Sequence, residues 1–294
     1  MFVGSFKLPK GDVLIHAGDL TNQGSFAELR KAVKWIEEAD FQVKIVVAGN
    51  HDITLDSDFY AQHGPSFHNQ PPQDPIACQN LLDDSPSIVW LKHESKVIEL
   101  VSPAGQRVSF KIFGSPFSPV KGRWAFGYRA DEAAQIWNDI PLDTDIMVTH
   151  TPPKYHCDMK EGQSMGCEAL RCTLERIKPR LAICGHVHEG RGAESIRWDL
   201  AASDSEANQP PVRLWTDPGR DNKKISLVNL TTRSNNIRDS KDEGSFLSSS
   251  QGLHAETCVV NCAIMASSWP HKGGVKHNKP IVVDINLPIP RTTS

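Results

Sequence analysis

The feature that most constrains the fold is a series of short apolar segments, each ending in a polar cluster. The first two occupy residues 13–17 (VLIHA) and 44–48 (KIVVA). Between them, Ser25 and Glu28 form a capping box, and apolar residues follow at helical spacing over residues 26–36. A strand–helix–strand pattern with almost continuously apolar strands is typical of a parallel βαβ unit. The chain is therefore expected to adopt an α/β fold.

The same pattern continues through the rest of the chain. Further buried strands are predicted at residues 145–150 (DIMVTH) and 180–188 (RLAICGHVH), and closing strands at 256–266 and 279–287. Residues 202–250 are polar and low in apolar content, which is typical of a disordered insertion. We expect one domain over residues 1–290, interrupted by this insertion.

Composition excludes some classes of protein. A net charge of −3 gives no support for non-specific binding to nucleic acid or to an anionic membrane. The chain has no run of about 18 apolar residues that would predict a membrane span. Residues 1–10 do not resemble a signal peptide. With seven cysteines, an odd number, these features favour a cytoplasmic protein with reduced thiols.

Four polar clusters follow predicted strands, at residues 18–19 (GD), 49–52 (GNHD), 150 (H) and 185–188 (GHVH). Because the carboxyl ends of strands converge on the ligand crevice of an α/β sheet, these clusters are expected to meet. One carboxylate, one amide oxygen and several imidazoles suit Mn, Fe or Zn better than Mg or Ca.

Each cluster also has a simpler interpretation. A single Gly-Asp after a strand is usually a turn, and a Gly-His-x-His sequence alone is a modest signal. His16 lies inside its strand and is interpreted as a core residue. Four such clusters in one order along the chain are hard to explain by accident. Asp52 is interpreted as the partner that orients His51, which could donate a proton to a leaving oxygen.

These motifs resemble the calcineurin-like metallophosphoesterase family. In order, the clusters match four of the family's five signature blocks, and the surrounding segments are most similar to the small MPPED-type branch in a fungal-looking form. The resemblance implies a four-layer sandwich, with two central mixed β-sheets flanked by helices and a dinuclear metal centre between them. It also implies hydrolysis of a phosphoester by a metal-bound hydroxide, with small phosphodiesters or nucleotides as substrates.

The resemblance further implies a role for each site residue. The metal ligands would be Asp19, bridging two metals, Asn50, His150 and His186, completing the second metal, and His188, binding the first. His51, helped by Asp52, would act on the leaving group, and Arg191 is a candidate phosphate contact.

The chain departs from the family at the first signature block, Asp-x-His, which nothing before Asp19 matches. We therefore expect the N-terminal strand to be missing and the first metal site to be impaired. A truncated gene sequence is favoured over a natural protein with a damaged site, because the other ligands are intact. Alternative functions are a non-catalytic module that binds one metal with a nucleotide or phosphate, and a nuclease or protein phosphatase. Weak net charge argues against a nuclease. The sequence does not indicate the substrate, the native metal or the oligomeric state.

Overall fold

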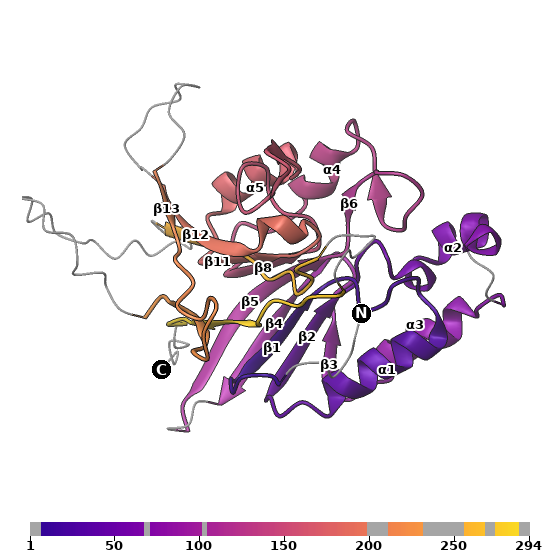
Figure 1. Cartoon of the computed structure of the whole chain (residues 1–294), viewed down its shortest axis with the longest axis horizontal. Helices are drawn as coiled ribbons and strands as arrows, with labels where there is room; N and C mark the ends of the chain where they lie inside the picture. Colours follow the sequence, from indigo (N-terminus) through magenta and orange to yellow (C-terminus); the bar gives the residue numbers. More distant parts are fainter. Residues whose placement is uncertain are drawn as a thin grey trace, which may run out of the picture.

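Two β-sheets occupy the centre of the protein in the computed structural model, which describes residues 7–67, 71–101, 105–198, 211–231, 256–267 and 274–287 (Figure 1). The first sheet is parallel, in the order β1 (Val13–Ala17), β2 (Val43–Val47), β3 (Ile88–Trp90). The second sheet is mixed and has seven strands, in the order β13 (Val212–Leu214), β12 (Gly192–Arg197), β15 (Glu256–Asn261), β11 (Leu181–Cys184), β8 (Ile146–Thr149), β5 (Arg107–Ser115), β4 (Glu94–Val101).

The remaining elements are helices and short strand pairs. The α-helices are α1 (Phe26–Glu37), α2 (Ser57–His63), α3 (Pro75–Asp83), α4 (Ala133–Asn138) and α5 (Glu168–Ile177). Three 3₁₀ turns are η1 (Ile53–Leu55), η2 (Gly64–Ser66) and η3 (His188–Gly190). The strand pairs are β6 (Ser118–Pro119) with β7 (Gly127–Tyr128), β9 (Met159–Lys160) with β10 (Gln163–Ser164), and β14 (Ser226–Asn229) with β16 (Ile281–Asp284).

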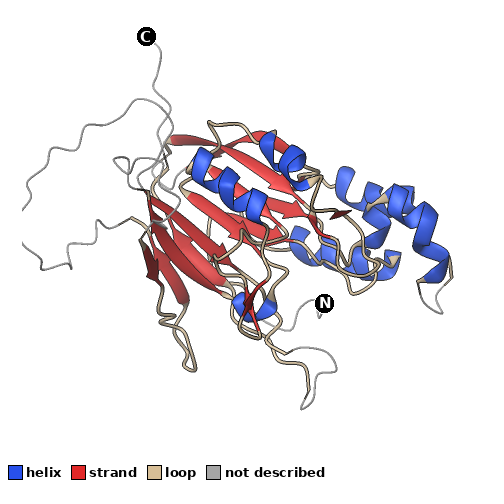
Figure 2. Cartoon of the chain, turned by 90° about the horizontal axis from the view of Figure 1, so that it is seen from above, coloured by secondary structure: helices blue, strands red, loops and turns tan. Residues whose placement is uncertain are grey.

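The two sheets pack face to face, and helices cover their outer faces (Figure 2). Along β2, Val47 points into the core between the sheets, where it belongs to one cluster with Val148 of β8 and Ile183 of β11. Its neighbour Val46 points to the opposite face and packs with α1 and α3, as the alternation of a strand requires. Helices α4 and α5 cover the outer face of the second sheet, where Trp137 is fully buried. The predicted α/β class is confirmed.

Helix α1 forms as its sequence predicts. The capping box between Ser25 and Glu28 is present, and the apolar face of the helix is buried through Leu29, Ala32, Val33 and Ile36. Because the helix crosses from β1 to β2, it sets these two strands parallel and in adjacent positions. In the described part of the chain, β1 is an edge strand that pairs with β2 alone.

Two expectations about the fold are corrected. The first sheet is parallel throughout its described strands, not mixed. Within the expected disordered insertion, residues 211–231 are ordered and contribute β13 and β14, whereas residues 202–210 and 232–250 lie outside the described residues. Strand β13 has three residues, all exposed at the edge of its sheet, so it lacks the longer run with a buried face that identifies a strand in a sequence.

The packing of α1 predicts that substitutions on its buried and exposed faces change the free energy of unfolding by different amounts. Leu29→Ala should lower the free energy of unfolding by about 2–5 kcal/mol, because it opens a cavity at a fully buried position. Arg30→Ala, on the exposed face of the same helix, should change it by less than about 0.5 kcal/mol. Chemical denaturation of both variants checks this, and equal effects would contradict the assigned packing.

Candidate metal centre

Four donor side chains from the ends of four strands gather at one place. Asp19 follows β1, Asn50 follows β2, His150 follows β8 and His186 follows β11. Asn50 Oδ1 lies 2.9 Å from His150 Nε2 and 2.9 Å from His186 Nδ1. The two imidazole nitrogens are 3.1 Å apart, and Asp19 Oδ1 lies 3.4 Å from His150 Nε2. The fold therefore brings these four side chains together, as the sequence predicted.

The backbone of β1 fixes the tautomer of His150. Its Nδ1 lies 2.9 Å from the carbonyl oxygen of Ala17, which can only accept, so Nδ1 carries the proton. In the neutral ring, Nε2 then presents a lone pair to the oxygens of Asn50 and Asp19. With the ring only 1% exposed, these acceptors need a donor or a cation among them, which can be the Nδ1–H of His186, 3.1 Å from His150 Nε2 and 2.9 Å from Asn50 Oδ1, or a bound metal ion.

The spacing and chemistry of the donors fit a metal ion. Donor atoms about 2.1 Å from a metal lie about 3.0 Å apart at adjacent corners of an octahedron, which is the range seen in this cluster. Two imidazoles, an amide oxygen and a carboxylate form a mixed N/O set that suits Mn, Fe or Zn. In the described ranges, no group of three or more His, Cys, Asp or Glu side chains is arranged to hold a metal. Asp19, His186 and Asn50 instead lie at hydrogen-bonding distance from His150, and Asn50 lies at that distance from His186 as well.

The backbone at this cluster is unusual in two respects. Asp19 and His186 have φ values of 57° and 60°, in the left-handed region that non-glycine residues rarely adopt. Beside them, a Cβ on Gly49 would lie 2.4 Å from Asp19 Oδ1, and a Cβ on Gly18 would lie 2.2 Å from His150 Nδ1. The two glycines therefore make the space into which the donors fit.

Burial and mutual charge set the ionisation of the donors. Burial alone would raise the pKa of Asp19, but the imidazoles of His150 and His51 outweigh it and lower that pKa below its usual value. Burial, assisted by His150, lowers the pKa of His186 to about 3. Burial also lowers the pKa of His188. A carboxylate that stays charged and imidazoles whose pKa is lowered, as at His186 and His188, favour the deprotonated forms that metal ligation needs.

His51 and His188 lie beside the cluster. The backbone N–H of His51 donates to Asp19 Oδ1 at 3.0 Å, and its ring Nδ1 lies 2.7 Å from the carbonyl oxygen of Asn22. His188 opens η3 and is close enough for the charge of Asp19 to act on it. Sequence analysis missed Asn22, because a backbone carbonyl leaves no trace in the residue type.

Asp52 serves a different purpose from the one expected. Its carboxylate accepts hydrogen bonds from the backbone N–H groups of Leu20 (3.1 Å), Thr21 (2.8 Å) and Gly49 (2.8 Å), and from the Thr21 hydroxyl. Burial and the charge of Asp19 raise its pKa to about 6, while these donors oppose the rise. Asp52 thus joins the loop after β1 to the loop after β2, and the orienting contact of the His51 ring is with a carbonyl instead.

Arg191 also differs from expectation. Its guanidinium donates to Asp217 at 3.1 Å, to the Ser226 hydroxyl at 3.4 Å and to the Lys279 carbonyl at 2.8 Å. Arg191 and Asp217 are mostly buried, with side chains 13% and 12% exposed. These contacts attach the segment after η3 to residues 217–226 and to the start of the last closing strand, so the guanidinium is occupied within the protein and is not presented to a phosphate.

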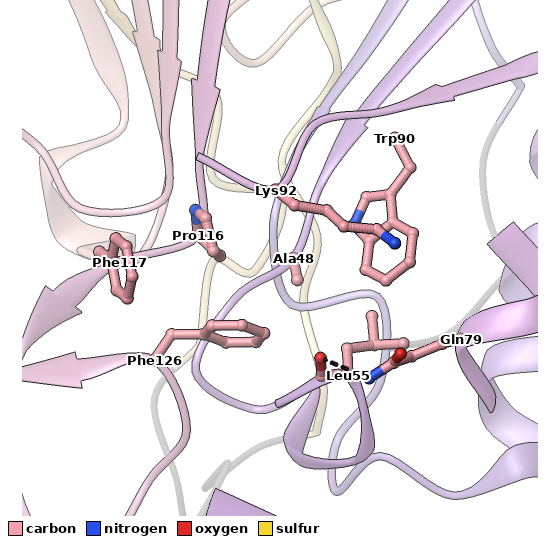
Figure 3. A pocket seen from close by; sticks show the side chains of 8 residues that line it. All are labelled: Ala48, Leu55, Gln79, Trp90, Lys92, Pro116, Phe117 and Phe126. Carbon is pink, nitrogen blue, oxygen red and sulfur yellow. Dashed lines mark hydrogen bonds between the residues drawn. The ribbon is translucent and has the colours of Figure 1, made fainter. Parts of the chain in front are cut away.

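A small cavity of about 110 Å³ lies next to the loop that carries Asn50 (Figure 3). It is lined by Ala48, Leu55, Gln79, Trp90, Lys92, Pro116, Phe117 and Phe126. The lining is mostly apolar, and the Lys92 ammonium lies 3.9 Å from the centre of the Trp90 ring. None of the expected metal ligands lines this cavity, so it is separate from the donor cluster.

The contacts of Asp52 predict a structural defect. Asp52→Ala should lower the free energy of unfolding by about 3 kcal/mol or more, because it leaves several buried N–H groups unpaired. Asp84→Ala, at an exposed carboxylate, should change it by less than about 0.5 kcal/mol. Urea denaturation measures both, and a stable Asp52→Ala protein would show that the two loops do not depend on this carboxylate.

Comparison with known proteins agrees with this geometry. Residues 3–190 match the family model described as calcineurin-like phosphoesterase. The chain is 37% identical over 210 residues to the probable rhamnogalacturonate lyase C of Emericella nidulans, which covers 71% of this chain and 18% of that protein. It is 34% identical over 219 residues to metallophosphoesterase domain-containing protein 1 of Homo sapiens, which covers 70% of this chain and 64% of the human protein.

A UPF0046 protein of Caenorhabditis elegans is 34% identical over 188 residues, covering 64% of this chain and 60% of that protein. The chain thus spans less than two thirds of the length of each of these relatives. The solved structure of TT1561 from Thermus thermophilus aligns at 15% identity with a TM-score of 0.39, over 62% of this chain and 70% of that one. Because the family model covers more than half of its residues, the chain belongs to the calcineurin-like phosphoesterase family.

Proposed function

We propose that this protein is a metal-dependent phosphoesterase that hydrolyses a small phosphoester, most simply a phosphodiester. The observation that carries the proposal is the cluster of Asp19, Asn50, His150 and His186, in which two oxygens face an imidazole lone pair. Two imidazoles, an amide oxygen and a carboxylate form a donor set that suits a transition metal. Membership of the calcineurin-like phosphoesterase family supports the same function.

The proposal assigns each donor a task. Asp19 keeps its carboxylate charged and has two oxygens, so it can bridge two metal sites. Asn50, His150 and His186 hold the second metal, and His188 belongs to the first. Bound divalent metal ions supply Lewis acidity, which polarises a phosphoryl group and lowers the pKa of water. Mn, Fe or Zn is the proposed cofactor, and the first site is proposed to be the weaker one.

His51 is the proposed proton donor for the leaving oxygen. Its Nδ1 is held by the Asn22 carbonyl, which leaves Nε2 as the nitrogen that exchanges a proton with the substrate. Its backbone N–H also holds Asp19, so the position of the ring is tied to the position of the metal ligand. Asp52 stabilises both loops by accepting hydrogen bonds from their backbone amides.

A second candidate is a non-catalytic module that binds one metal and a nucleotide or phosphate. The observation in its favour is that the compact cluster contains donors for one metal only. His188 lies nearby, and no hydrogen bond joins it to the other four in the described structure. The two candidates differ in metal content and in turnover.

Replacement of a central ligand tests the leading proposal. The chain supplied with Mn²⁺ should hydrolyse bis(4-nitrophenyl) phosphate, and His150→Ala should reduce the rate by more than about 100-fold, since even outer-shell changes at metal sites cost about 10–100-fold. Nitrophenol release and elemental analysis measure rate and metal content together. About one metal per chain without hydrolysis, at Mn²⁺ concentrations high enough to fill the weaker first site, would favour the binding module over the enzyme.

A glycine pair tests the site without removing a ligand. Gly49→Ala should weaken Mn²⁺ binding by at least about 10-fold, because the new Cβ would meet Asp19 Oδ1 at 2.4 Å and push the donors apart. Gly192→Ala is the matched control, since its nearest neighbour would be 3.9 Å away. Calorimetric titration compares them. Unchanged Mn²⁺ affinity in Gly49→Ala would place the metal elsewhere.

A further inference from the structure

A row of aromatic side chains starts at His51 and leads away from the metal ligands. The indole of Trp124 packs on the His51 imidazole with ring centres 4.0 Å apart and a 37° tilt. Phe67 follows, 5.4 Å from Trp124, and Phe59 lies 5.7 Å from Phe67. Trp124, Phe67 and Phe59 are only partly buried. We call these three residues the aromatic wall.

The loop that carries Trp124 is fixed to the metal-ligand loop. The N–H of Ala125 donates to the carbonyl oxygen of Asn50 at 3.2 Å, and the N–H of Phe126 donates to Asp56 Oδ2 at 2.8 Å. The backbone of Asn50 therefore helps to position the Trp124 indole, while the side chain of Asn50 is a donor in the cluster.

The same loop also carries positive charge. Lys121 and Arg123 are exposed on either side of Gly122, whose φ of 72° makes the tight turn between them. The loop thus presents cations together with a partly exposed indole beside His51. Flat rings stack favourably on indole, and anions are attracted to the flanking cations. This pairing matches an anionic ester that carries a ring.

We propose that Trp124 is a specificity-determining residue that stacks on a flat ring in the leaving group of the phosphoester. The proposal rests on the proposed function and adds to it the class of leaving group. In hydrolysis, the oxygen of water bonds to phosphorus and gives one proton to the solvent, while the bond to the leaving oxygen breaks. That oxygen keeps the electron pair and takes a proton from Nε2 of the His51 imidazolium, which regains a proton from the solvent. A ring on the leaving oxygen then lies within reach of the indole next to His51.

Phosphate monoesters that differ only in the ring provide the test. Phenyl phosphate is compared with methyl phosphate, and adenosine 5′-phosphate with ribose 5-phosphate, as inhibitors and as ligands of the Mn²⁺-loaded protein. Trp124→Ala should weaken binding of the ring-bearing member of a pair about 10-fold and leave the other unchanged, and Trp124→Phe should restore most of the loss. The pair that responds more strongly distinguishes an aryl ring from a nucleobase.

Intrinsic fluorescence gives a readout that does not need turnover. The ring-bearing ligands should quench wild-type fluorescence more than Trp124→Phe fluorescence, because the stacked indole is absent from the variant. Equal weakening of all four ligands by Trp124→Ala would overturn the proposal, as would no weakening of any. If the protein binds ring-bearing ligands in this way but hydrolyses no phosphoester, the proposed aromatic subsite stands and the proposed phosphoesterase function is wrong.

Discussion

The hydrophobic core between the two sheets determines which strand ends can meet. Val47, Val148 and Ile183 belong to this core, and each stands within a few residues of a donor at the end of its own strand. Because the strands that carry these donors run parallel within their sheets, face-to-face packing brings their carboxyl ends to one edge of the structure. The sheets thereby place a carboxylate, an amide and two imidazoles so that each has a donor atom within 3.4 Å of at least one of the others.

That proximity has a chemical consequence. A buried imidazole whose Nδ1 proton is committed to the Ala17 carbonyl offers only a lone pair to two oxygen acceptors. Asp19 and His186 both have positive φ, a costly conformation that persists because the surrounding structure enforces it. Asp52 binds the amides of both loops beneath the site and prevents them from separating. The protein therefore holds together a set of donors whose chemistry suits a metal ion.

Sequence reasoning located the donors because each follows an apolar strand, a pattern that is visible in a single chain. It could not find partners that depend on three-dimensional contacts. The Asn22 carbonyl that holds His51 has no signature in the residue type. Arg191 looked available for phosphate, yet its guanidinium binds Asp217 in a region that had been expected to be disordered. Trp124 lies far beyond His51 in the chain, and only the fold shows that their rings touch.

Diffraction from crystals soaked in Mn²⁺, recorded where manganese scatters anomalously, tests the central claim most directly. We predict an anomalous peak bounded by Asp19 Oδ1, Asn50 Oδ1, His150 Nε2 and a nitrogen of His186, with His150 Nδ1 still bonded to the Ala17 carbonyl. A weaker second peak near His188 agrees with an impaired first site. The absence of any peak among these four donors would contradict the account.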